Sequence, residues 1–272
     1  MFKRFVVRLS LLSMLLLWGG GAQALVLAIN EGVTYQVNRD EVAQRYAGVA
    51  ADLSRLLKQP VSVEVVTDYP SLRKGLGEKR FDLALIHPAH VSIQAIKQSG
   101  FRLVAVVRGF QGYQAQFLVD GKSPLTSLQQ LKGAHLGAPD EDSITSVMVR
   151  AALRDAGLAP QDVRITYTRY QDAVPFFIEN GLTAAGATAS TKVVKAWLDK
   201  GGKLLGKSRA VPIKHVIASP LLSLEQVEQV RDYLLTLDAS VDGRKRLEAM
   251  RYPGFDRFEQ ADLLALGTWL GL

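Results

Sequence analysis

Residues 81–91 have the sequence Phe-Asp-Leu-Ala-Leu-Ile-His-Pro-Ala-His-Val, and this stretch contains the clearest sign of the fold. Residues 82–86 are almost continuously apolar, which is typical of a strand covered by helices on both faces. Pro88 and the histidines on either side then begin a stretch with helical spacing of apolar residues. A strand that leads directly into a helix is the repeating unit of a parallel sheet, so the segment predicts an α/β fold.

The same alternation of strands and helices continues on both sides of this segment. In the first part of the chain it predicts strands at 25–30, 61–66, 81–86 and 103–108 and helices at 46–57 and 71–77. The pattern then restarts, with predicted strands at 114–119, 134–138, 164–167, 183–187 and 214–218 and helices at 127–131, 143–156, 171–179, 191–200, 224–237 and 241–250. This restart predicts two α/β units.

We therefore expect two Rossmann-like lobes joined by a two-crossing hinge. The first lobe is expected to comprise residues 25–109 and 213–272, with residues 110–212 forming an inserted lobe. The last two predicted helices would return to the first lobe. The chain is expected to cross between the lobes near residues 109–112 and 210–212, where glycine and proline indicate irregular backbone. Two such crossings form a hinge.

The first 24 residues have the three parts of a secretory signal peptide. Lys3, Arg4 and Arg8 precede the apolar run 9–18, and the small-x-small tripeptide 22–24 follows. An uncleaved anchor is the alternative, but the apolar run is shorter than the roughly 20 helical residues that span a bilayer. We expect cleavage after the tripeptide and a periplasmic location for the mature chain.

The composition argues against several classes of function. Without the three basic residues of the leader, 30 basic residues stand against 26 acidic ones, a net charge of +4 that is mild for a nucleic-acid-binding protein. The only tight basic cluster, 244–246, lies on a helical pattern, where a solvated face is the usual explanation. The chain has no cysteine, which excludes thiol catalysis, disulfides and a cysteine-linked lipid anchor. A freely diffusing monomer that binds no nucleic acid is expected.

Recognisable catalytic motifs are absent from the sequence. It has no phosphate-binding glycine loop, no His-Glu-x-x-His zinc motif and no Gly-x-Ser-x-Gly nucleophile elbow. None of its four histidines are spaced by four residues, as in a helical zinc pair, although His87, His90 and a carboxylate are one conceivable metal site. We expect a binding protein that is not an enzyme and holds no cofactor or metal.

The segment 137–147 runs from a predicted strand end into the start of a predicted helix. A helix start offers free N–H groups and a positive dipole end, and Ser143, Thr145 and Ser146 add hydroxyl donors, so an oxyanion is the expected ligand. Ligands of open α/β sheets bind beyond the carboxyl ends of strands, where this segment lies. The alternative is that Ser143 only caps the helix, and the acidic residues 140–142 would repel an anion.

His87 and His90 follow the carboxyl end of another predicted strand. Both imidazoles are candidates to donate a hydrogen bond to an anion across the cleft between the lobes. The alternative is an ordinary capping or packing role at the start of a helix. We include both histidines among the expected ligand-binding residues.

The order of several segments resembles the phosphate, phosphite and phosphonate binding proteins of ABC transporters, which have the type II periplasmic binding protein fold. The resemblance covers nearly all of residues 25–272. It is carried by Tyr46-Ala-Gly-Val-Ala-Ala-Asp-Leu, Asp68-Tyr69, residues 81–91, Thr145-Ser146 and Asp172-Ala173-Val174. No one of these segments is unique, and their order after a signal peptide makes the combination specific.

In that family a Ser-Thr-Ser run at a helix start in the inserted lobe holds the oxyanion, helped by tyrosines of the first lobe. The resemblance places residues 144–146 at this run, where an isoleucine replaces one hydroxyl and Ser143 partly compensates. It also implies ligand contacts for Tyr46 and Tyr69, and it places His90 where the family has an aromatic residue.

Two further positions depart from the family pattern. Gln171, an expected ligand-binding residue, stands where the family commonly has a histidine, and Ala184 stands where it has an acidic residue. Losing that carboxylate removes the partner of an ammonium group, which argues against an aminoalkylphosphonate ligand.

The resemblance implies a solute-binding protein that captures a small phosphonate- or phosphate-like oxyanion for an ABC permease. Ligand binding would shift a hinge equilibrium towards a closed form that the permease recognises. The alternative is a sensing role, in which the closed form docks on the periplasmic sensor domain of a kinase or cyclase.

Overall fold

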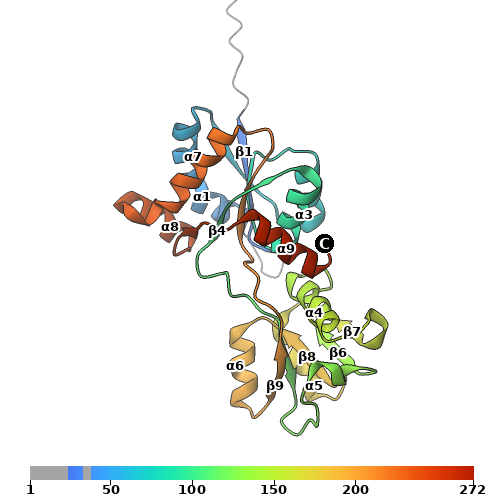
Figure 1. The fold of residues 1–272 in the computed structure, drawn as a ribbon. Coiled ribbons are helices and arrows are strands. Elements are labelled where there is room, and N and C mark those ends of the chain that lie inside the picture. Colours follow the sequence, from blue (N-terminus) through green and yellow to red (C-terminus); the bar gives the residue numbers. More distant parts are fainter. Residues whose placement is uncertain (1–23, 33–37) are drawn as a thin grey trace, which may run out of the picture.

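The computed structural model describes residues 24–32 and 38–272, which form two β-sheets, each covered by helices (Figure 1). Apart from Ala24, the expected signal peptide lies outside the described residues. The first strand begins at Leu25, directly after the expected cleavage point. Within the described ranges, no helix combines the length and the hydropathy needed to cross a membrane.

The first sheet has the strand order β11-β4-β10-β3-β1-β2. β1 pairs in parallel with β2 and β3, whereas β10 runs antiparallel between β3 and β4. The strands are β1 (Leu25–Asn30), β2 (Val61–Val65), β3 (Leu83–Ile86), β4 (Arg102–Val107), β10 (His215–Ala218) and β11 (Phe255–Asp256). All residues of β3 are buried, as its continuous apolar sequence predicts.

The second sheet has the order β7-β6-β8-β5-β9, with β6 parallel to β7 and β8. Its strands are β5 (Gln116–Val119), β6 (His135–Ala138), β7 (Arg164–Tyr167), β8 (Ala185–Thr188) and β9 (Lys203–Lys207). Sequence analysis missed β9, an edge strand whose lysines and first leucine are exposed. The predicted two-lobe α/β architecture is confirmed, because one continuous stretch of chain supplies the whole second sheet.

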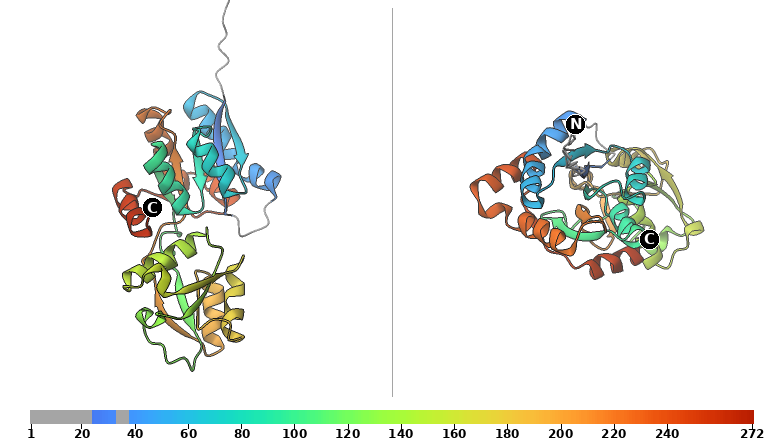
Figure 2. Two further views of the ribbon diagram at one scale, coloured as in Figure 1. Left: turned by 90° about the vertical axis from the view of Figure 1, so that its right-hand side faces the viewer. Right: turned by 90° about the horizontal axis from the view of Figure 1, so that it is seen from above.

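Helices cover both faces of the first sheet (Figure 2). Leu27 and Ile29 pack on one face with α1 (Arg39–Leu57), α7 (Leu224–Leu235) and α8 (Val241–Met250). Ala28, between them in the strand, points to the other face, which is covered by α2 (Tyr69–Gly77), α3 (Ala89–Ser99) and α9 (Gln260–Leu270). The second sheet carries α4 (Ile144–Asp155), α5 (Val174–Glu179) and α6 (Thr191–Asp199). Short 3₁₀ helices occupy Leu128–Leu131, Pro160–Asp162, Gln171–Ala173 and Leu237–Ala239.

Helix α1 begins at Arg39, earlier than the apolar spacing predicts. Asn38 caps it, since its side-chain oxygen accepts from the amides of Asp40 at 3.0 Å and Glu41 at 3.3 Å. Most of the first turn is polar and exposed, so hydrophobic periodicity alone does not reveal it.

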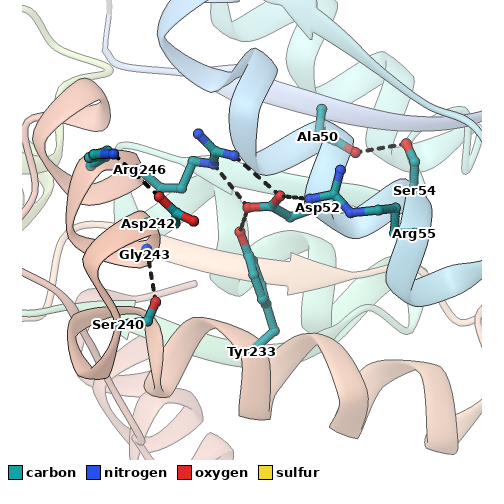
Figure 3. Close-up of polar contacts among 10 residues, drawn as sticks. Ala50, Asp52, Ser54, Arg55, Tyr233, Ser240, Asp242, Gly243 and Arg246 are labelled. Atoms are coloured by element: carbon teal, nitrogen blue, oxygen red, sulfur yellow. Dashed lines mark hydrogen bonds and ion pairs between the residues drawn. The ribbon is translucent and has the colours of Figure 1, made fainter.

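Asp52 connects three helices of the first lobe (Figure 3). From α1, its carboxylate accepts hydrogen bonds from Tyr233 of α7 at 2.8 Å and Arg246 of α8 at 3.0 Å, and it also pairs with Arg55. Burial raises the pKa of Asp52, but the bonds from Arg246 and Tyr233 outweigh burial and hold the pKa below its usual value. This cluster and the shared core place α7 and α8 on the first sheet, as expected.

The two segments that connect the sheets lie side by side. Tyr113 and Val211 form an antiparallel bridge, in which the Val211 amide donates to the Tyr113 carbonyl at 2.9 Å. The amide of Ile213 donates to the carbonyl of Phe110 at 3.1 Å. Gly109 has a φ of +81°, a left-handed conformation that glycine adopts without strain, so the first connection turns sharply as it leaves β4.

Helix α9, which sequence analysis did not predict, joins the two lobes near the C-terminus (Figure 1). It packs against α3 of the first lobe and α4 of the second. At the end of α4, Arg154 donates to the carbonyl of Trp269 at 2.7 Å, and the Trp269 indole donates to Asp155 at 2.9 Å. Arg209 of the second connection also pairs with Asp155, at 3.0 Å. The lobes therefore meet through α9 as well as through the chain crossings.

Candidate ligand-binding site

The start of α4 lies at the junction of the lobes, and its hydroxyls are largely engaged within the loop. Ser143 is the N-cap, and its hydroxyl accepts from the amide of Ser146 at 3.2 Å. The Ser146 hydroxyl donates to the carbonyl of Pro139 at 2.9 Å. The capping role of Ser143 is thus observed. The amides of Ile144 and Thr145, in the first turn, have no acceptor within the helix, and they lie at the positive end of its dipole.

Thr145 belongs to a hydrogen-bond chain that starts between the lobes. Its hydroxyl lies 2.8 Å from the hydroxyl of Tyr113, in the first connection. Gln171 donates to Tyr113 at 3.1 Å and accepts from Thr188 at 3.0 Å and from the amide of Ala189 at 2.6 Å. Gln171 therefore fixes the Tyr113 side chain from the carboxyl end of β8.

Ala184 does not belong to this group. It precedes β8, is exposed, and donates its amide to the carbonyl of His135 at the beginning of β6. The carboxyl end of β8, where Gln171 binds, is occupied by Thr188. The expectation that Ala184 replaces a ligand-holding acid was wrong, because that residue lies at the opposite end of the strand.

A cluster of first-lobe residues meets Asp142, which precedes the α4 cap. Arg73 of α2 donates two hydrogen bonds to the Asp142 carboxylate, both at 2.7 Å. The His90 ring nitrogen Nε2 lies 3.5 Å from the same carboxylate. Tyr69 contacts both partners: its ring lies edge-on to His90 at 5.8 Å and under the Arg73 guanidinium at 5.7 Å. Asp142, one of the three acidic residues that the sequence placed near the anion site, is thus paired with an arginine.

The protonation states of this cluster follow from burial and pairing. Burial lowers the pKa of His90, although Asp142 opposes this shift, so the imidazole is neutral near pH 7. Contacts with His90 and then Arg73 hold the pKa of Asp142 below its usual value. His90 is only 1% exposed, and neither of its ring nitrogens has a hydrogen-bond partner. The Nε2 atom faces the Asp142 carboxylate at 3.5 Å, so the Nδ1 atom is the buried polar atom of His90 for which no partner is seen among the described residues.

Tyr46 lies in a second cluster, near the carboxyl end of β1. Its hydroxyl donates to Glu31 at 3.0 Å and contacts the Tyr252 hydroxyl at 3.2 Å, and Arg45 pairs with the other Glu31 oxygen. Burial raises the pKa of Tyr252 to about 12, so this phenol keeps its proton. Tyr46 is 1% exposed, and both hydrogen-bond partners of its hydroxyl, Glu31 and Tyr252, belong to the first lobe.

His87 and Lys214 extend this second cluster along the sheet edge. Lys214 lies 4.2 Å from the ring centre of Phe110 and 4.7 Å from that of Tyr252. Burial, and then the charge of Lys214, lower the pKa of His87 to about 3. The Nδ1 atom of His87 is buried without a hydrogen-bond partner. Sequence analysis missed Lys214 and Phe110, whose only sequence signal is their position at the two lobe connections.

The structure thus divides the expected site residues into three groups. Ser143, Thr145, Ser146 and Gln171 lie on the second lobe, Tyr69 and His90 meet that lobe at Asp142, and Tyr46 and His87 lie in the cluster of Glu31 and Lys214. Within the described residues, no three histidine or acidic side chains are placed to hold a metal ion. A cavity of about 20 Å³ lies in the apolar core of the first lobe, where Tyr46 and residues of β1, α1, β3 and α7 line it.

A protein-family model described as the periplasmic substrate-binding protein of phosphonate ABC transporters matches residues 32–263. The chain belongs to this family. The match spans both lobes and every residue of the three groups except Glu31. It supports the transport interpretation, and nothing in it favours the alternative of a sensor partner.

Solved structures with the same fold include several binding proteins. PhnD1 of Prochlorococcus marinus, in complex with methylphosphonate, is 19% identical with a TM-score of 0.64, over 90% of this phosphonate-family chain and 96% of that one. XAC2383 of Xanthomonas citri, bound to ATP, is 14% identical with a TM-score of 0.75, over 91% and 97% of the chains. The aliphatic sulphonate binding protein SsuA of Escherichia coli is 17% identical with a TM-score of 0.57, over 91% and 85%. At these identities the likeness shows the type II fold alone.

Proposed function

We propose that this member of the phosphonate-binding family captures a small oxyanion between its lobes and presents it to an ABC permease. The observation that carries the proposal is the junction at the start of α4. There Thr145 and Tyr113 form a hydroxyl pair, and Asp142, directly before the Ser143 cap, lies 3.5 Å from His90, whose buried ring nitrogens make no hydrogen bond. A neutral imidazole and helix amides are donors that suit an oxyanion.

Several other expected residues support this site indirectly, by positioning the groups that would contact the ligand. Ser143, Ser146 and Gln171 hold the α4 start and Tyr113 in place, and Tyr69 packs on His90. Arg73 keeps the Asp142 carboxylate from repelling an anion, since it compensates that charge. Preorganised donors of this kind lose little conformational freedom when the ligand binds.

Capture is coupled to closure of the hinge. We place the lobe boundaries at residues 109–110 and 212–213, where the two connections run side by side. A ligand that contacts both lobes binds the closed form more tightly and so shifts the equilibrium towards it. The protein is proposed to act as a monomer in the periplasm, and mass spectrometry of the exported protein should show an N-terminus at Leu25.

A thermal-shift screen with methylphosphonate, phosphate, phosphite, methanesulfonate and acetate tests the ligand class. A ligand at 100 times its dissociation constant stabilises the folded state by about 2.7 kcal/mol. Titration calorimetry of Thr145→Val should then show at least a tenfold loss of affinity for the best oxyanion, because a charge-assisted hydrogen bond is removed. Thr191→Val, on the exposed start of α6, is the matched control. Unchanged affinity in Thr145→Val removes the α4 start from the site.

A further inference from the structure

Lys214 lies at the edge of the first sheet from which the chain crosses to the second lobe. It directly precedes β10, where His215 pairs with Ile86 in antiparallel register, so Lys214 is opposite His87 at the end of β3. β1 ends at the same edge, since Asn30 pairs with Ile86 in parallel register. Ligands of α/β sheets bind beyond this carboxyl edge. Lys214 therefore occupies a ligand-facing edge of the first lobe.

Two aromatic rings hold the Lys214 ammonium. Its Nζ atom lies 4.2 Å from the centre of the Phe110 ring and 4.7 Å from that of Tyr252. The Tyr252 hydroxyl is a weak third partner at 3.5 Å. The two rings pack edge-to-face on each other with their centres 6.0 Å apart, so both cation–π contacts come from adjoining sides and fix the position of the charge without neutralising it.

No acidic side chain in the described part of the chain lies within 4.0 Å of the Lys214 ammonium. Glu31, the nearby carboxylate, is engaged by Arg45 and by Tyr46 at 3.0 Å. Burial lowers the pKa of Lys214, as expected for a partly desolvated ammonium without an ion-pair partner. Beside it, the buried Nδ1 atom of His87 also lacks a partner. The cluster thus carries net positive charge and an unfilled hydrogen-bonding position.

The first connection joins this cluster to the oxyanion site. Phe110 packs on Lys214, and Tyr113, three residues later, contacts Thr145. Three extended residues span at most about 10 Å. Phe110 and Tyr113, which contact Lys214 and Thr145 respectively, therefore lie no more than about 10 Å apart along the first connection.

We propose that Lys214, caged by Phe110 and Tyr252, binds a second acidic group of the ligand, so that the protein selects oxyanions that also carry a carboxylate. The ligand class is a phosphonocarboxylate. This inference rests on the proposed function, because the α4 start must hold the phosphonate end. Among the described residues, the carboxylates of the two clusters, Glu31 and Asp142, are already paired with arginines, which also argues against the ammonium of an aminoalkylphosphonate.

Three phosphonates that differ only in the end group test the inference: 3-phosphonopropionate, propylphosphonate and 2-aminoethylphosphonate. Titration calorimetry of the whole mature protein at fixed ionic strength should show 3-phosphonopropionate binding at least about tenfold more tightly than propylphosphonate. The aminoethyl compound should bind most weakly, because its ammonium meets Lys214. Lys214→Met should reduce the preference for 3-phosphonopropionate over propylphosphonate from tenfold to less than threefold. Lys203→Met, which removes the same charge from the exposed edge of the second sheet, should keep the preference.

The outcomes separate this inference from the proposed function. If propylphosphonate binds as tightly as 3-phosphonopropionate, or Lys214→Met keeps the preference, Lys214 does not bind a second acidic group and the oxyanion site stands. If none of the three compounds binds, the phosphonocarboxylate inference fails, and the proposed function also fails only if the thermal-shift screen finds no other oxyanion. The order of the three affinities in the parent protein decides the question even if Lys214→Met does not fold.

Discussion

Arg73 of α2 and Asp142 at the start of α4 form a two-point ion pair across the lobes, with both distances at 2.7 Å. The side chains are 35% and 48% exposed, so solvent screens the pair and its contribution to global stability is about 1 kcal/mol or less. A free energy of this size is nevertheless enough to bias a hinge whose open and closed forms differ by a few kcal/mol. The pair is therefore expected to favour the closed form.

Arg73→Ala should open the ligand-free protein because it removes this bias. Small-angle X-ray scattering is expected to give a larger radius of gyration for the variant than for the parent, with little change in melting temperature. Lys195→Ala, which removes an ion pair within α6, is the control and should leave the radius unchanged. Equal radii for Arg73→Ala and the parent would show that the pair does not bias the hinge.

Asp52→Asn should destabilise the first lobe. The substitution weakens the hydrogen bonds from Tyr233 and Arg246 and is expected to lower the free energy of unfolding by about 1–3 kcal/mol at pH 7. Because the folded pKa of Asp52 lies below its unfolded value of 3.8, this stabilisation is present above that pH and is lost as the pH falls through the folded pKa. Urea unfolding should therefore show the difference at pH 7 and a smaller one at pH 3. Asp199→Asn, on exposed α6, serves as the control.

Stability should decrease as the pH falls below about 6.5. Burial lowers the pKa of His87 to about 3 and that of His215 to about 4, so the unfolded chain takes up protons that the folded chain does not. Each such histidine changes the free energy of unfolding by up to about 1.4 kcal/mol per pH unit. Urea unfolding between pH 7 and pH 5 measures the slope of the free energy of unfolding against pH. His87→Gln should reduce this slope by up to the contribution of one histidine, about 1.4 kcal/mol per pH unit. A free energy that does not change over this range would contradict the assignment of neutral, buried imidazoles.

Tyr46→Phe should affect stability more than ligand binding. The Tyr46 hydroxyl bonds Glu31 and Tyr252 inside the first lobe, so its removal is expected to cost about 1 kcal/mol of folding stability. Affinity for the preferred oxyanion should change by less than about threefold, since the buried hydroxyl bonds Glu31 and Tyr252 and is not expected to contact the ligand. Calorimetric titration and urea unfolding measure the two effects. A tenfold loss of affinity at full stability would instead place the Tyr46 hydroxyl in direct contact with the ligand.

Local pattern accounts for the parts of the fold that were predicted. The buried strand β3 is apolar throughout, and α4 follows its strand after a serine cap, so sequence alone reveals both. Sequence analysis missed α9, whose bridging role depends on contacts with α3 and α4, far away in the chain. It also missed the edge strand β9 and the capped first turn of α1, because neither shows a clear apolar period.

The sequence by itself determined the α/β class, the two lobes, the family and the hydroxyl-rich helix start at Thr145, because each is written in short segments or in their order. Only the tertiary structure decided which charges matter at the junction. Arg73 meets Asp142 across 69 residues, and Lys214 has two aromatic neighbours but no carboxylate within ion-pair distance among the described residues. Whether a charge is neutralised or left for a ligand depends on which side chains folding brings within a few ångströms, and spacing along the chain does not contain that information.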